Sequence, residues 1–190
     1  MGALRVIAGE FRSRRLKAPR GDDVRPTPDR LRETLFNVLA PVIADTTFVD
    51  AYAGSGAVGI EALSRGARRA IFIERSRGAA AIIRENLNAL GIVERAEVVV
   101  GRATTVLARV SADIVFLDPP YALGGEYESA LKLLGERGGA QVIAQHDVRL
   151  KLEDAYGQLR RTRTLRQGDN VLSFYAATPS LAPNAEVPAG

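Results

Sequence analysis

Three acidic residues stand at the ends of apolar stretches of this chain, where carboxylates could do chemistry. Asp50 ends the stretch TTFVD, Glu74 ends AIFIE, and Asp118 ends DIVFLD. A carboxylate accepts hydrogen bonds from hydroxyl and amine groups and attracts positive charge. We therefore expect these residues to face a ligand that carries hydroxyls, amines or a cationic centre.

A glycine-rich stretch follows Asp50 closely. Gly54-Ser55-Gly56-Ala57-Val58-Gly59 fits the pattern G-x-G-x-x-G, and Glu74 lies 20 residues past Gly54. Glycines let the backbone approach a ligand closely, and a carboxylate at the next strand end can accept two bonds from a ribose diol. The pattern by itself suits dinucleotides and other nucleosides equally.

Asp50 distinguishes between these ligands. A fixed carboxylate beside the loop would repel a pyrophosphate and attract a cation. The chain of 190 residues also leaves no room for a second domain of the size usual in dehydrogenases. A nucleoside with a ribose diol, a sulfonium, an ammonium and no phosphate describes S-adenosylmethionine, which we expect as the cofactor.

The sequence Asp118-Pro119-Pro120-Tyr121 follows five apolar residues with no transition. A turn is more easily made with Gly or Asn, so a fold alone does not require an acid, two prolines and an aromatic residue here. The bland alternative is a proline turn with an incidental acid and a core tyrosine. Beside the glycine loop and Glu74, the combination favours a site.

Alternating strand and helix patterns position these residues. Strands are predicted at 46–50, 70–74, 96–101, 113–118 and 140–145, and helices at 60–66, 76–90, 103–109 and 126–135. Such alternation predicts an α/β, doubly wound, Rossmann-like parallel sheet with right-handed crossovers, in which ligands bind at the carboxyl ends of the strands. The stretches 159–165 and 170–177 predict a closing antiparallel hairpin around Gln167-Gly168-Asp169, which makes seven strands.

The two ends of the chain are predicted to differ from this body. LRVIAGEFRSRRLKAP (4–19) reads as a small β-hairpin around Ala8-Gly9-Glu10. Thr27 and Pro28 are typical of a helix start, and that helix is expected to stop before Pro41. We divide the chain into a basic N-terminal hairpin and loop (1–26), an α/β body (27–176) and a flexible tail (177–190).

Positive charge is concentrated at the N-terminus. Residues 1–32 carry nine basic and four acidic side chains, a net +5, while the remaining 17 basic and 18 acidic side chains sum to −1. Arginine forks suit phosphates and stack on bases, so this segment suggests a nucleic-acid partner. A solvated basic face without a ligand is the alternative from charge alone.

Composition excludes several kinds of chemistry. The chain has no cysteine, which rules out disulfides, thiolate zinc sites and a cysteine nucleophile. With His146 as the single histidine, we expect no metal site. No apolar run reaches the length of a membrane span and the N-terminus lacks the apolar stretch of a signal peptide, so a cytoplasmic location is expected.

Taken together, the motifs resemble a known family. The residues from Asp50 to Gly56, with Glu74 and DPPY, look like a class I S-adenosylmethionine-dependent methyltransferase that acts on an exocyclic amine. More narrowly, RVIAGEFRSRRL, RPTPDRLRETLFNVL, GSGAVGIEALSRGA and FLDPPY resemble the bacterial 16S rRNA (guanine-N2) methyltransferases over about residues 4–176.

The resemblance implies a role for each matching position. Asp50, Ala51 and Gly54-Ser55-Gly56 would hold the methionine part of the cofactor, and Glu74, followed by Arg75, would take the ribose hydroxyls. Arg102 and Ala103 would lie by the adenine. Because an arginine side chain cannot accept a hydrogen bond, adenine recognition there would use backbone atoms or Ala103.

A guanine N2 amine is a poor nucleophile because its lone pair is delocalised into the ring. Two acceptors at the amine protons favour pyramidalisation and stabilise the developing charge. Asp118 would be one acceptor and the Pro119 carbonyl the other, with Pro120 keeping the residue before it extended. Tyr121 would offer a flat face to the extruded base.

The basic N-terminus would then hold RNA, with a splayed single-stranded loop of rRNA in a small ribosomal subunit as the expected target. The candidates are Arg12, Arg14, Arg15, Lys17 and the segment Arg25–Arg32, Arg30 included. Other assignments stay open. Arg160, Arg161 and Arg163 form either a second RNA-binding basic patch or a solvated strand face. Phe36 and Asn37 approach the cofactor, or Phe36 is part of the helix core. Tyr52 either covers the cofactor or packs against the protein. His146 is interpreted as an incidental loop residue.

Three other functions compete with this one. The same chemistry could act on DNA adenine or a protein glutamine, although such enzymes often carry Asn in place of Asp118 and a larger recognition region. The chain could be a compact NAD-dependent oxidoreductase. It could also be an RNA-binding module with a dead nucleoside fold, although the intact Asp118 and Glu74 argue against that.

Overall fold

The computed structural model describes residues 4–19, 29–120 and 124–177. Its strands are β1 (Thr47–Asp50), β2 (Arg69–Glu74), β3 (Ala96–Val100), β4 (Ile114–Leu117), β5 (Gln141–Asp147), β6 (Ala155–Tyr156), β7 (Leu159–Gln167) and β8 (Asn170–Ala177). They form one sheet in the order β3-β2-β1-β4-β5-β8-β7-β6. The strands β1 to β5 are parallel, and β8, β7 and β6 extend the sheet in antiparallel fashion.

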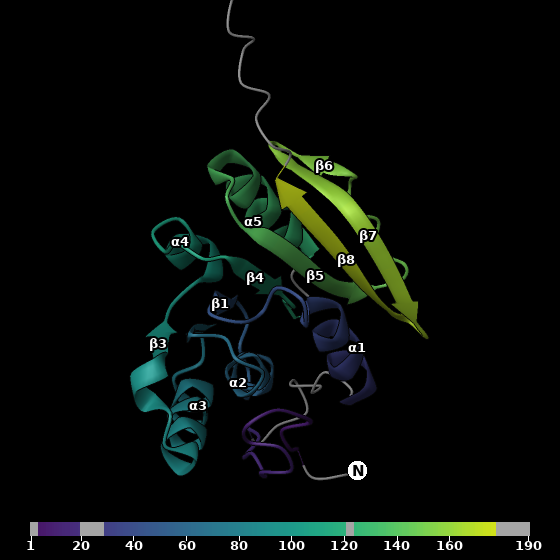
Figure 1. Cartoon of the computed structure of the whole chain (residues 1–190). Helices are drawn as coiled ribbons and strands as arrows, with labels where there is room; N and C mark the ends of the chain where they lie inside the picture. Colours follow the sequence, from purple (N-terminus) through teal and green to yellow (C-terminus); the bar gives the residue numbers. More distant parts are fainter. Residues whose placement is uncertain (1–3, 20–28, 121–123, 178–190) are drawn as a thin grey trace, which may run out of the picture.

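Helices cover both faces of this sheet. They are α1 (Asp29–Leu39), α2 (Ala57–Ser64), α3 (Arg77–Leu90), α4 (Ala103–Leu107) and α5 (Gly124–Arg137), with a short 3₁₀ turn at Val93–Arg95. Figure 1 shows α4 and α5 on one side, and α1, α2 and α3 with the N-terminal segment on the other. The predicted doubly wound α/β fold and the antiparallel closing hairpin are confirmed.

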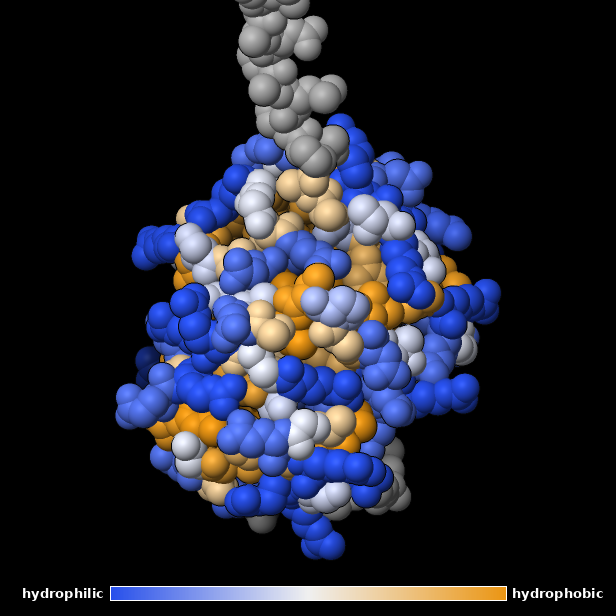
Figure 2. All heavy atoms as spheres, in the orientation of Figure 1, coloured by the Kyte–Doolittle hydropathy of each residue, from blue (hydrophilic) through white to orange (hydrophobic). Residues whose placement is uncertain are grey.

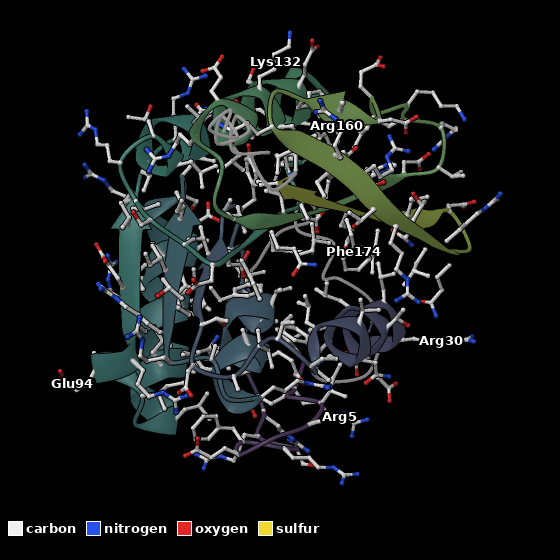
Figure 3. All side chains as sticks on the ribbon, turned by 45° about the horizontal axis from the view of Figure 1, so that its top comes forward. Arg5, Arg30, Glu94, Lys132, Arg160 and Phe174 are labelled. Carbon is white, nitrogen blue, oxygen red and sulfur yellow. The ribbon has the colours of Figure 1, made fainter. Side chains whose placement is uncertain are left out.

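Apolar patterning explains these elements. β1, β2, β4 and β5 are continuous buried runs, as expected for parallel strands covered on both faces. The helix α1 turns Leu31, Leu35 and Leu39 toward the sheet, where Phe174 of β8 lies between sheet and helix (Figure 3). The helix α3 begins where the Ser76 hydroxyl accepts a hydrogen bond from Ala79 N and ends at Gly91, whose φ is 70°.

Two details of the predicted strand count are wrong. The described residues contain eight strands rather than seven, because the two-residue β6 pairs with β7. The expected β-hairpin at 4–19 is short: its one antiparallel bridge, Arg5 with Arg15, is flanked by hydrogen bonds from Val6 N to the Arg14 carbonyl and from Leu16 N to the Leu4 carbonyl. The backbone amides of Ile7 and Ala8 donate to the Glu61 carboxylate of α2 instead of to a partner strand, which interrupts the ladder.

The helix α2 begins three residues earlier than predicted, at Ala57, and ends at Ser64. Gly56, with φ 79°, precedes its first residue, so the glycine motif itself forms the start of the helix. Thr27, Pro28, the boundary at 26/27 and residues 178–190 of the expected tail lie outside the described residues. Ala177, assigned to the tail, is the last residue of β8.

The residues 4–19, called here the N-terminal segment, pack on the body. Val6, Phe11 and Leu16 are buried in one apolar cluster with residues of α2 and α3, among them Leu63 and Leu87. Beneath it, the fully buried Arg32 donates to the Arg5 carbonyl at 2.6 Å and lies 3.9 Å from the Glu61 carboxylate. The N-terminal segment is therefore attached by both apolar contacts and buried polar groups.

Close packing of α2 on the sheet depends on Gly59. A Cβ added there would lie 2.3 Å from Cε1 of Phe72, whose ring is fully buried. We expect Gly59→Ala to lower the free energy of unfolding by about 1–3 kcal/mol through overpacking. Gly78→Ala in the first turn of α3 is the matched control, because its Cβ meets nothing closer than 3.8 Å.

The control should leave stability unchanged or raise it by as much as about 1 kcal/mol, since alanine is the better helix former. Urea unfolding of both variants gives the comparison. Equal effects of the two substitutions would show that the α2–β2 contact is not the tight point of the fold.

Candidate active site

The site lies where the sheet order reverses, between β1 and β4. The chain leaves β1 for α2 on one face of the sheet, and it leaves β4 for α5 on the other. Ligands of doubly wound sheets bind in the crevice that this divergence opens. Asp50 is the last residue of β1, and Asp118 follows the last residue of β4.

The strand-end residues point to the same face of the sheet. Side chains two positions apart on a strand share a face. Asp50 follows Phe48 in this way and Asp118 follows Phe116, and both phenylalanines belong to the apolar cluster beneath α1 and α2. Glu74 follows Phe72, which packs under α2 and α3. The three predicted acids therefore line one edge of the sheet on the side of these helices.

Asp50 is buried, with 2% of its surface exposed, and its Oδ2 accepts a hydrogen bond of 3.0 Å from Gly59 N. Burial raises the pKa of Asp50 to about 7, and the nearby Glu74 charge adds to the rise, while the Gly59 hydrogen bond opposes it. A nearby cation would favour the charged form of this carboxylate.

Glu74 joins the glycine loop to the start of α3. Its Oε2 accepts from Gly54 N at 2.8 Å, and its Oε1 accepts from Ser76 N at 2.7 Å. A direct hydrogen bond thus joins Glu74 to Gly54, the two residues that stand 20 positions apart in the sequence. Each carboxylate oxygen has more than one lone-pair site, so these bonds leave acceptor capacity for hydroxyl donors.

The glycine loop itself is held from both sides. Gly54 and Gly56 have φ of 53° and 79°, a backbone region that favours glycine. Ala51 N donates to the Phe116 carbonyl and Ala53 N to the Ile73 carbonyl, so the loop continues the sheet. The Ser55 carbonyl accepts from the buried Asn86 side chain of α3.

A second polar group lies at the predicted adenine position. Nη2 of Arg102 is 3.6 Å from Oε1 of Glu126 on α5, and Ala103 is buried at the start of α4. The Tyr52 hydroxyl donates to Glu126 Oε2 at 3.0 Å. Burial and this hydrogen bond raise the pKa of Tyr52 well above its usual range. Tyr52 thus links the glycine loop to α5.

Asp118 is half-buried, and its Oδ2 accepts a hydrogen bond of 3.0 Å from Nε2 of Gln145 on β5. Pro119 is buried and Pro120 is exposed, whereas Tyr121 lies outside the described residues. Gln145 was not predicted as a site residue. The sequence did contain a signal for Gln145, because it stands two residues after the apolar Ile143, just as Asp118 stands two residues after Phe116.

The predicted RNA-binding residues have different surroundings. Arg12, Arg15 and Arg30 are exposed, and Figure 3 shows Arg30 on α1 pointing away from the body. Arg14 donates to the Ala89 carbonyl, and Lys17 forms an exposed ion pair of 2.8 Å with Glu85. Arg25 lies outside the described residues. Arg32 had been expected in the RNA-facing segment Arg25–Arg32, but it is fully buried.

Several open assignments are also answered. Phe36 is fully buried core and stacks 5.3 Å from the Arg65 guanidinium, so it does not face a cofactor. His146 is not a loop residue: it lies within β5, where its ring contacts the Ser173 hydroxyl and the Asp147 carbonyl. Burial lowers the pKa of His146.

The arginines of the second basic patch are also distinguished by their contacts. Arg160 donates to backbone carbonyls, Arg161 pairs with Asp154 and Tyr175, and Arg163 is exposed.

Two further features of the described residues concern metals and membranes. No group of three or more Asp, Glu or His side chains there is arranged to hold a metal ion. None of the helices in residues 4–19, 29–120 and 124–177 is long and apolar enough to cross a membrane.

The sheet order and the glycine loop after β1 define a Rossmann-like α/β fold, and similarity to known proteins places the chain among the methyltransferases. The chain belongs to the family described as "Conserved hypothetical protein 95", whose model matches residues 4–176. The resemblance drawn from the sequence motifs is confirmed by its relatives.

"Ribosomal RNA small subunit methyltransferase D" of Escherichia coli K12 is 45% identical over 139 residues, which are 72% of this chain and 69% of that protein. The protein of the same name from Haemophilus influenzae is 40% identical over 140 residues, or 71% of this chain and 72% of that one. A solved structure described as "Putative methyltransferase yhhF from Escherichia coli" is 37% identical with a TM-score of 0.79, covering 93% of this chain and 98% of its own.

The buried Asp50 makes stability depend on pH. Because its pKa is raised from the ordinary value of about 4, the folded state holds the proton more tightly than the unfolded state. The contribution of proton binding by Asp50 to the stability of the folded state is complete below about pH 4 and is lost as pH rises to about 7. Three pKa units at 1.36 kcal/mol each correspond to a difference on the order of 4 kcal/mol.

We expect Asp50→Asn to abolish this loss, so that the variant gains stability over the natural chain as pH rises from about 4.5 to 8 in urea unfolding. Asp45→Asn, which removes a carboxylate from an exposed turn, is the control. A pH-independent difference between Asp50→Asn and the natural chain would contradict the assignment of the buried charge.

Proposed function

We propose that this chain transfers a methyl group from S-adenosylmethionine to the exocyclic N2 amine of a guanine in small-subunit rRNA. The observation that carries the proposal is the placement of Asp50 and Asp118 at the ends of adjacent strands, where the sheet order reverses. One carboxylate suits a cationic cofactor and the other an amine substrate, and the two stand at neighbouring strand ends. Relatives named as rRNA small subunit methyltransferases support this reading.

The residues around the glycine loop fit S-adenosylmethionine. When bound, that group supplies an electrophilic methyl on a sulfonium. Asp50 offers a buried carboxylate to positive charge, and Glu74 offers acceptors for the ribose hydroxyls. Gly54 and Gly56 let the backbone approach the ligand without a Cβ. Ala51, Ser55, Arg75, Arg102 and Ala103 would complete the pocket.

The same charges argue against a dinucleotide. Asp50 and Glu74 are close enough for the Glu74 charge to raise the pKa of Asp50. A pyrophosphate beside the loop would add two negative charges to these carboxylates in a site that already disfavours one of them. The pocket therefore suits a phosphate-free nucleoside better than NAD.

Asp118 and the Pro119 carbonyl would accept the two protons of the substrate amine. Two hydrogen bonds from the amine to these acceptors favour a pyramidal nitrogen, free its lone pair and stabilise the positive charge that develops there. Pro120 restricts Pro119 to extended backbone, which keeps its carbonyl in one direction. Asp118 then takes the amine proton. Figure 2 shows one face of the molecule, on which apolar surface lies among hydrophilic side chains.

The RNA would lie across the N-terminal segment. Arg12 and Arg15 are exposed there, and Arg30 is exposed on the neighbouring α1. A base that is methylated on its edge must leave its stack, so a single-stranded loop of rRNA in an assembling or assembled small subunit is the proposed substrate. A ribosomal substrate implies a cytoplasmic enzyme.

We expect Asp118→Ala to lower methyl transfer at least 100-fold, because alanine leaves the substrate amine without its side-chain acceptor. Binding of RNA and of S-adenosylhomocysteine should change less than twofold. Tritiated methyl transfer to small-subunit particles, free rRNA, DNA and protein is measured, followed by nucleoside mass spectrometry for N2-methylguanosine.

The control is Asp113→Asn, at the opposite end of β4, which should keep full activity. Transfer to DNA or protein but not to RNA would replace the substrate. No transfer to any of the four would leave an RNA-binding module.

The N-terminal segment is tested by salt dependence. We expect Arg12→Ala with Arg15→Ala to weaken RNA binding and to lower the slope of log K against log salt by about 0.7 for each phosphate that the variant no longer neutralises. Arg109→Ala with Lys132→Ala removes the same charge elsewhere, since Lys132 lies at the opposite end of the molecule from Arg5 (Figure 3). Equal slopes for the two variants would mean that RNA does not lie on the N-terminal segment.

A further inference from the structure

Gln145 is a buried amide directly against the proposed catalytic carboxylate. It belongs to β5, only 6% of its surface is exposed, and its Nε2 donates to Asp118 Oδ2 at 3.0 Å. Gln145 lies outside the sequence motifs described above, and the names of the related proteins indicate no role for it.

The sheet register brings the two residues together. Leu117 of β4 is paired with Ala144 of β5, so the next residue on each strand is Asp118 and Gln145. Each follows an apolar residue of the same cluster, Phe116 and Ile143, and therefore points to the same face. The Tyr127 hydroxyl of α5 donates to the Gln145 carbonyl, which holds this end of β5 against the helix.

The amide is not placed there for stability. Among the described residues, its Oε1 is buried and has no hydrogen-bond partner. A buried amide with an unpartnered oxygen is unfavourable, and a methionine of similar length would occupy the same space without that cost. The polar contact that the structure gives this side chain is the one to Asp118.

The orientation of the amide also follows from Asp118. Turning it over would place Oε1 against a carboxylate oxygen, which is repulsive. With Nε2 forward, Gln145 donates to the carboxylate, and such a hydrogen bond favours the ionised form and restricts rotation of the group. An acceptor for an amine proton must be both ionised and fixed in direction before the substrate arrives.

We propose that Gln145 is a positioning residue that holds the Asp118 carboxylate ionised and in one rotamer for the amine. The inference rests on the proposed function, because Asp118 must be the acceptor for its position to matter. It predicts that Gln145 affects turnover and not the binding of either ligand.

The first test is Gln145→Met. We expect kcat for rRNA methylation to fall about 10- to 100-fold, as for other small misplacements of a reacting group. KM for S-adenosylmethionine and Kd for RNA should stay within twofold, and the melting temperature should be equal or higher. Gln141→Met, on the same strand at the far end of the sheet, is the control and should leave kcat unchanged.

The second test is Gln145→Glu, which keeps the shape but places a second carboxylate beside Asp118. Two carboxylates at this distance cannot both ionise easily, so the apparent pKa of the pair rises. Activity, which is lost as the acceptor is protonated, should then be lost at a pH about one unit or more higher than in the natural chain. Gln141→Glu should leave the pH profile in place.

Other titratable groups surround this end of β4, and they are the same in every variant. They are Asp50 on β1, Glu126 and Tyr127 on α5, and His146 and Asp147 on β5. A change between the Gln145→Glu and natural profiles therefore reports residue 145.

The outcomes separate the inference from the function on which it rests. If the natural chain methylates rRNA and Asp118→Ala does not, but Gln145→Met keeps full kcat, the inference is wrong. An unmoved pH profile in Gln145→Glu overturns it as well, including when Gln145→Met is too unstable to assay. If the natural chain transfers no methyl group at all, the proposed function fails first.

Discussion

The candidate site depends on the divergence of the chain after β1 and β4, the point in a doubly wound sheet at which a ligand crevice is expected. A carboxylate placed at that point is partly or fully removed from water, and so its charge interacts strongly with what enters the crevice. Asp50 shows the effect most clearly: burial raises its pKa to about 7, and Gly59 N is its hydrogen-bond donor. The glycine loop, Glu74 and Asp118 are arranged around this point by the strands that carry them.

The N-terminal segment and the glycine loop share their support. Asn86 of α3 accepts from Lys17 N and donates to the carbonyls of both Lys17 and Ser55. Glu61 of α2 accepts from the amides of Ile7 and Ala8. Both helices pack on the strands that carry Asp50 and Glu74. The proposed RNA-facing surface is thus anchored to the elements that carry the proposed cofactor-binding residues, which suits an enzyme that must bring two ligands together.

The parallel strands and their order of appearance were predictable because each is a short buried run followed by a helix pattern. The site acids followed from the same pattern, since each closes such a run. Other features were not predictable. The two residues of β6 are too few to show any periodicity. The N-terminal pairing is shorter than expected, and the amides of Ile7 and Ala8 bond to Glu61 instead. Arg32 has the sequence surroundings of a surface arginine, but Glu61, 29 positions away, makes it a buried one.

The amino-acid sequence by itself determined the fold class, the glycine loop, the three strand-end acids and the chemistry that the DPPY motif suggests. Each of these depends on local spacing, which hydrophobic periodicity and residue type reveal directly. Only the tertiary structure decided which strand ends are neighbours, that Gln145 faces Asp118, and that Asp50 is buried enough to alter its pKa. Those features arise from contacts between residues far apart in the chain, and sheet order and register, which local patterns do not specify, bring them together.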